Sequence, residues 1–146
     1  MKMLVMAAML FVVATNVLAQ KAEIFQKEGA AIRGYDVVAF FKEQKPVKGL
    51  TDYATQWKDA TWRFSSQQNL DSFKVSPEKY APQYGGYCAY GIADGHKAPT
   101  ETNTWTVLDG KLYFNYNQEV KSTWDKDRPG YIEKANRNWE KIKLAE

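Results

Sequence analysis

The chain carries a single cysteine, Cys88, among its 146 residues. A lone cysteine cannot form an intramolecular disulfide, so the stability of the fold has to come from a packed apolar core. The material for that core is aromatic, with 5 Trp, 9 Tyr and 7 Phe, and each such side chain buries a large apolar area with few rotatable bonds. The cysteine itself must be buried and inert, bound to a metal, or reactive.

Residues 1–19 have the pattern of a secretory signal peptide. Lys2 gives a short positive region, residues 3–15 form an apolar run without charge, and Val17-Leu18-Ala19 offers small residues where a signal peptidase cleaves. The run is shorter than the roughly 20 apolar residues of a spanning helix, so we expect no stable membrane anchor after its removal. We predict a periplasmic or secreted protein in which residues 20–146 form one domain.

Charge excludes one class of partner. The formal net charge is only +3, and acidic and basic residues are interspersed without a polybasic block of the kind that neutralises phosphates. We therefore expect no nucleic-acid partner.

Hydrophobic patterning predicts two β-hairpins. Apolar and polar residues alternate over residues 53–64 around a turn at 58–60. In the second hairpin, residues 105–108 and 111–114 flank Asp109-Gly110, the dipeptide favoured in type I′ turns.

Helical signals occur between and after these hairpins. Ser66 is expected to cap a helix that Pro77 ends, and Pro77 is suited to start a further helical turn. Additional helices are expected at residues 87–93, 118–127 and 131–143, the last two separated by Pro129-Gly130, whereas residues 37–41 suit either a buried strand or a short helical turn. The mixture predicts an α+β fold, with a small antiparallel sheet packed against short helices and with helices at the C-terminus.

The residues around Cys88 predict a reactive or metal-binding thiol. A thiol that follows Gly85-Gly86-Tyr87 at the start of a short helix would meet unpaired backbone N–H groups and the positive end of the helix dipole. Both would lower the thiol pKa below its usual value of about 8.5, and the thiolate is the active form in metal ligation and in redox attack. The alternative is a cysteine that packs as a small apolar side chain among the neighbouring tyrosines.

Two further side chains are candidate ligands. His96 is the only histidine, and the loop between it and Cys88 would let both approach one metal ion. Asp36 follows Tyr35 and is either a turn-former that bonds its own backbone or an oxygen ligand. A nucleophile–base pair of Cys88 and His96 lacks a third, orienting residue.

With no Cys-x-x-Cys, zinc-histidine or phosphate-loop motif in the chain, we expect a binding module rather than an enzyme.

Five segments in order carry a family resemblance. They are residues 34–41, 60–66, 69–73, 77–89 and 105–116, and the similarity spans about residues 34–139. Together they resemble the YHS domain family, in its exported single-domain branch. That family is described by its fold and by its association with heavy-metal and copper-handling proteins, and some members of this branch carry selenocysteine where this chain has Cys88.

The resemblance implies a reactive or metal-bound sulfur, but a different site from that of metal-associated members. Those members carry cysteines at places that here hold Ala39, Ser65 and Asn69. Soft thiolate ligands select copper(I) or zinc, so without these cysteines a metal site in this chain has to be built around Cys88.

We therefore predict a module that binds a soft transition-metal ion, copper or zinc, with Cys88 as thiolate ligand and with His96 and Asp36 as co-ligands. A competing hypothesis is a redox protein in which Cys88 is oxidised to sulfenic acid and resolved by a thiol partner protein. A third hypothesis gives Cys88 a purely architectural role. The other candidate site residues are Tyr35, Gly85, Gly86 and Tyr87.

Overall fold

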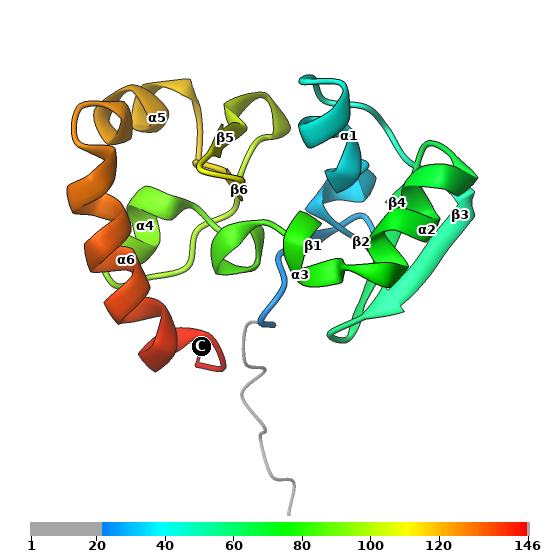
Figure 1. Cartoon of the computed structure of the whole chain (residues 1–146). Helices are drawn as coiled ribbons and strands as arrows, with labels where there is room; N and C mark the ends of the chain where they lie inside the picture. The colour runs from blue at the N-terminus through cyan, green and yellow to red at the C-terminus, as the bar shows by residue number, and fades with distance from the viewer. Residues whose placement is uncertain (1–21, 146) are drawn as a thin grey trace, which may run out of the picture.

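The computed structural model describes residues 22–145. The signal peptide predicted at residues 1–19 lies outside the described residues. The remaining chain has the α+β fold predicted from the sequence, with short antiparallel hairpins, short helices and two C-terminal helices (Figure 1).

Within residues 22–145 the strands form three separate antiparallel hairpins. These are β1 (Gln26–Lys27) with β2 (Ala30–Ala31), β3 (Leu50–Trp57) with β4 (Ala60–Phe64), and β5 (Thr106–Leu108) with β6 (Lys111–Tyr113). Both predicted hairpins are confirmed, and Asp109 and Gly110 have the positive φ angles, 51° and 73°, that a type I′ turn requires. The sequence did not predict the N-terminal hairpin, because two-residue strands are too short to show alternation.

The helices match the expected signals with one exception. They are α1 (Val37–Lys42), α2 (Gln67–Val75), α3 (Pro77–Tyr80), α4 (Ala89–Ala93), α5 (Gln118–Asp125) and α6 (Arg128–Ile142), with 3-10 turns at Ile32–Gly34, Gln83–Gly86 and Thr102–Thr104. Ser66 caps α2 as predicted, since its Oγ accepts a hydrogen bond from the backbone N–H of Asn69 at 3.1 Å. No helix in the described part of the chain is long and apolar enough to cross a membrane.

The exception is the break predicted at Pro129-Gly130, which is wrong. Helix α6 already begins at Arg128, and the carboxylate of Asp127 caps it by accepting a hydrogen bond from the N–H of Gly130 at 3.2 Å. Proline is tolerated in the first turn because an N–H there would have no helical partner. The break between α5 and α6 therefore falls at Lys126 and Asp127.

Strand β6 separates two apolar clusters. Leu112 and Phe114 point into the first, and Tyr113 points into the second, because successive side chains of a strand lie on opposite faces. Figure 1 shows the two sides, with β1–β4 and α1–α3 on one and α4–α6 on the other. Large members of the first cluster are Trp62, Phe64, Phe73 and Phe40, and those of the second are Trp124, Tyr84, Tyr87 and Ile92.

The run Tyr84-Gly85-Gly86 allows the N-terminal segment to lie against the second cluster. All three residues have positive φ angles, 57°, 62° and 86°. The N–H of Phe25 donates to the carbonyl of Gly85 at 2.8 Å, and a Cβ at position 85 would overlap the carbonyl oxygen of Glu23. The glycine pair is therefore required by the turn and by this close backbone approach.

We expect Gly85→Ala to destabilise the protein more than Gly95→Ala. Gly95 also has a positive φ, 91°, but nothing lies within 4 Å of its Cβ direction, so its substitution should cost only the left-handed backbone penalty of about 1 kcal/mol. Gly85→Ala adds the overlap with Glu23 and should cost at least about 3 kcal/mol. Urea unfolding followed by tryptophan fluorescence measures both, and equal losses would contradict the role given to the close approach.

Candidate functional site

Cys88 joins helix α4 to the segment that follows β6. It is 1% exposed and forms a backbone bridge with Phe114. Its Sγ accepts hydrogen bonds from the N–H groups of Gly91 at 3.4 Å and Tyr116 at 3.2 Å, and its thiol donates to Oδ1 of Asn115 at 3.6 Å. The sulfur therefore has two donors and one acceptor around it, all provided by the fold.

The prediction of a lowered thiol pKa is wrong. Burial raises the pKa of the Cys88 thiol, because apolar surroundings penalise the thiolate, and this outweighs the opposite effect of the N–H groups of Gly91, Tyr116 and Tyr90. The expected dipole effect is small because α4 has only 5 residues. At neutral pH the thiol is protonated.

Asn115 is a site residue that the sequence analysis missed. It is 0% exposed, and its Oδ1 accepts from the Cys88 thiol and from the N–H of Tyr90 at 3.2 Å. Its Nδ2 has no hydrogen-bond partner within residues 22–145, which is uncommon for a buried amide. The only signal for it in the sequence is a polar side chain between Phe114 and Tyr116.

The structure places Cys88 and His96 in the lining of one depression. The depression has a volume of about 280 Å³ and is lined by Cys88, Tyr90, Gly91, His96, Ala98, Tyr116 and Val120. The imidazole of His96 is 58% exposed, and its Nδ1 lies 3.6 Å from Oδ2 of Asp94. Cys88, whose sulfur is buried, and His96, whose side chain is exposed, thus line the same depression.

Asp36 does not line this depression and has a structural role instead. It is 0% exposed, and its Oδ1 caps α1 by accepting from the N–H groups of Val38 at 2.9 Å and Ala39 at 3.1 Å. Its Oδ2 accepts from the N–H and Oγ of Ser65, at 2.8 and 2.7 Å, and from Nδ2 of Asn69 at 2.8 Å. The expectation that Asp36 bonds local backbone is confirmed, and the same carboxylate also joins α1 to α2.

Ala39, Ser65 and Asn69, which the predicted resemblance aligns with cysteines of metal-associated YHS domains, meet at this carboxylate. The backbone of Ala39 and the side chains of Ser65 and Asn69 all donate to Asp36. In this chain the place is filled by a hydrogen-bond network in which both carboxylate oxygens have partners. Within residues 22–145 no group of three His, Cys, Asp or Glu side chains is placed to hold a metal ion.

The other predicted site residues support the backbone and the core. Tyr35 is partly buried and forms a backbone bridge with Lys48. Tyr87 is 7% exposed and donates its hydroxyl to the carbonyl of Ala22 at 2.7 Å, and burial raises the pKa of that hydroxyl. Gly85 and Gly86 form the turn described above, and neither lines the Cys88 depression.

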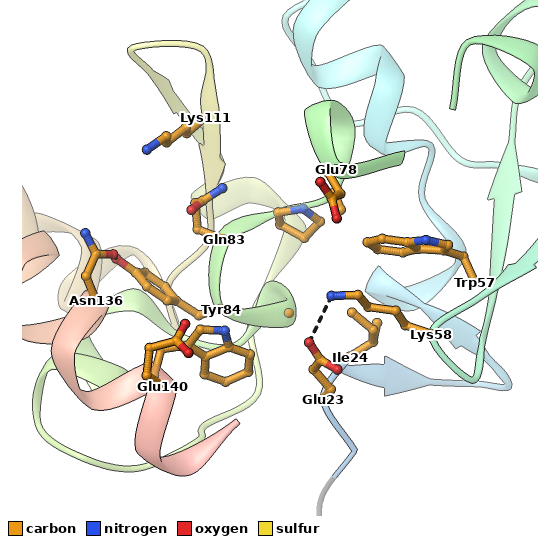
Figure 2. A pocket seen from close by; sticks show the side chains of 14 residues that line it. Glu23, Ile24, Trp57, Lys58, Glu78, Gln83, Tyr84, Lys111, Asn136 and Glu140 are labelled. Carbon is orange, nitrogen blue, oxygen red and sulfur yellow. Dashed lines mark hydrogen bonds and ion pairs between the residues drawn. The ribbon is translucent and has the colours of Figure 1, made fainter. Parts of the chain in front are cut away.

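A second cavity, of about 410 Å³, lies between the two halves of the molecule (Figure 2). Nζ of Lys58 pairs with Oε1 of Glu23 at 3.0 Å and lies 4.9 Å from the ring centroid of Trp57. On the opposite wall the hydroxyl of Tyr84 donates to Oδ1 of Asn136 at 2.9 Å, and burial raises the pKa of Tyr84. The lining residues are Glu23, Ile24, Trp57, Lys58, Glu78, Ala81, Pro82, Gln83, Tyr84, Gly85, Lys111, Asn136, Trp139 and Glu140.

No family model, curated protein or solved structure matches this chain. The resemblance to YHS domains therefore stays a prediction from the sequence, and the function has to be argued from the geometry of the two cavities.

We expect Asp36→Ala to destabilise the protein by at least about 3 kcal/mol, because it removes a helix cap and leaves three further donors, two of Ser65 and one of Asn69, without an acceptor. Asp52→Ala is the matched control, since Asp52 is exposed on β3 and its loss should change the free energy of unfolding by less than about 0.5 kcal/mol. Urea unfolding measures both. If both variants lowered the free energy of unfolding by the same small amount, the hydrogen bonds of Asp36 would contribute little to stability.

We expect the alkylation rate of Cys88 in the native protein to rise with pH at a higher midpoint than in the urea-unfolded protein. The reason is the raised pKa of the native thiol, since only the thiolate reacts. By linkage, the native state should lose stability as the pH rises above the pKa of the unfolded thiol. Iodoacetamide kinetics followed by mass spectrometry give the two midpoints, and a native midpoint at or below the unfolded one would reverse the assignment of burial as the dominant effect.

Proposed function

We propose that the protein is a non-enzymatic module that binds a soft transition-metal ion, copper(I) in preference to zinc, through Cys88 and His96. The observation that supports this most is that Cys88, at the start of α4, and His96, in the loop that follows α4, line one depression of about 280 Å³. Thiolate sulfur and imidazole nitrogen are ligands that soft and borderline metals prefer.

A metal ion would reverse the protonation of the sulfur. In the metal-free protein, burial keeps Cys88 neutral, but a cation at the sulfur supplies the charge that the apolar wall lacks, and a coordinating thiol is deprotonated outright. The N–H groups of Gly91 and Tyr116 already point at Sγ. Hydrogen bonds to the charged form favour it, so the sulfur is provided in advance with donors that stabilise a bound thiolate.

The number of ligands favours copper(I). Zinc takes four ligands in structural sites, and three protein ligands plus water in catalytic ones. The depression offers two, since Asp36 lies elsewhere and the described residues contain no third ligand in reach. Copper(I) accepts fewer ligands than zinc and is selected by soft sulfur. The resemblance to YHS domains also favours copper, because that family is associated with copper-handling proteins.

The thiol-redox hypothesis fits the geometry less well. A redox-sensing cysteine has a low pKa and is accessible to solvent, whereas Cys88 is 1% exposed with a raised pKa. The architectural hypothesis explains the burial of Cys88, but it gives no role to His96 in the same depression.

We expect Cys88→Ser to lower the affinity for copper(I) by at least about 100-fold, because loss of a ligand exceeds the 10–100-fold effect of losing an outer partner of the metal. His96→Ala should lower it by about tenfold or more. The measurement is an anaerobic titration of the purified protein against a chromophoric copper(I) chelator. Binding should also release a proton, so the wild-type affinity should rise with pH.

Serine retains an oxygen that can accept the hydrogen bonds of Gly91 and Tyr116, so Cys88→Ser is expected to fold, and circular dichroism with urea unfolding checks this. Asp94→Asn is the control for the histidine, since it removes only the charge near the imidazole. Equal copper(I) affinity in the wild type and in Cys88→Ser would refute the proposal and leave Cys88 with an architectural role.

A further inference from the structure

The cavity between the two halves is built by segments that lie far apart in the sequence (Figure 2). The N-terminal segment, the turn between β3 and β4, α3 with the 3-10 turn after it, β6 and α6 all contribute side chains to it. Its volume of about 410 Å³ is in the range of small-molecule sites. It contains neither Cys88 nor His96, so it is separate from the proposed metal site.

Most charges around this cavity neutralise one another. Glu23 pairs with Lys58 at 3.0 Å, and Glu140 pairs with Lys143 at 3.1 Å. Two lining charges then remain that form no ion pair within residues 22–145: the carboxylate of Glu78 and the ammonium of Lys111. They have opposite signs.

The two remaining charges come from different elements of the fold. Glu78 lies on α3 and Lys111 on β6, and Figure 2 shows them on opposite sides of the cavity with Gln83 between them. A ligand that satisfies both must carry a positive and a negative group at its two ends.

Aromatic rings also line this cavity. Trp57 lies on one side and Tyr84 on the other, and Trp139 also lines the cavity. Tyr84 is held by its bond to Asn136, and the ring of Trp139 packs against that of Tyr84, with centroids 6.2 Å apart. Such fixed rings offer apolar area to the middle of a ligand at little cost in conformational entropy.

We propose that this cavity binds a small zwitterion, an amino acid whose ammonium and carboxylate groups are separated by a short apolar chain. The ammonium pairs with Glu78, the carboxylate pairs with Lys111, and the chain lies along Trp57 and Tyr84.

The test is a calorimetric titration of the purified protein with γ-aminobutyrate, δ-aminovalerate and ε-aminocaproate, which increase the distance between the two charges stepwise. Hexylamine and hexanoate have the chain of ε-aminocaproate but one charge each. We expect at least one zwitterion to bind about tenfold or more tightly than either singly charged analogue, because each end gains a charged hydrogen bond. Quenching of tryptophan fluorescence should accompany binding, since Trp57 and Trp139 line the cavity.

Glu78→Gln and Lys111→Met should each weaken binding of that zwitterion by about tenfold. Glu78→Gln should also weaken hexylamine, while leaving hexanoate unchanged. Glu78 and Lys111 are exposed, so neither substitution should disturb the fold. The charge-matched controls are Glu43→Gln and Lys45→Met, at exposed positions after α1, and they should leave binding unchanged.

The proposal is overturned if none of the three zwitterions binds at about 10 mM, if the singly charged analogues bind equally well, or if neither cavity variant weakens binding. Cys88→Ser should bind the zwitterion as the wild type does, so the result is independent of the copper(I) titration.

Discussion

The fold depends on the alternation of side chains along and just after β6. Leu112 and Phe114 complete one apolar cluster while Tyr113 completes the other, so a strand of 3 residues is shared by two cores. Both candidate sites follow from this arrangement. The residues after β6 reach Cys88 through Phe114, Asn115 and Tyr116, and the cavity of Figure 2 lies where the two halves meet beside Lys111.

The state of the thiol is decided by two opposing effects at one atom. Backbone N–H groups favour the thiolate, and the surrounding apolar side chains disfavour it more strongly. A site with this balance does not attack substrates readily at neutral pH, but it gains charge stabilisation when a cation arrives. For this reason we propose metal binding rather than redox chemistry for Cys88, although both were compatible with the sequence.

Asp36 shows how a side chain can be a reasonable metal ligand by its chemistry and still have a structural role in the fold. A carboxylate after a tyrosine, in a chain with one thiol and one imidazole, is a reasonable ligand on chemical grounds. The fold gives both of its oxygens to donors of α1, Ser65 and α2, and nothing in a linear pattern reveals that Ser65 and Asn69 arrive at the same point. The cavity between the halves escaped the sequence analysis for a similar reason, since Glu78 and Lys111 look like ordinary surface charges until α3 and β6 are placed in space.

The sequence by itself determined the elements that rest on local physics. Asp109-Gly110 sets its hairpin through backbone preference, Ser66 starts α2 through a local hydrogen bond, and the single cysteine requires a packed core. Only the tertiary structure decided the pKa direction of Cys88, the burial of Asp36 and the role of Asn115. The reason is that desolvation and hydrogen-bond partnership depend on which segments meet, whereas turn and cap preferences depend on a few consecutive residues.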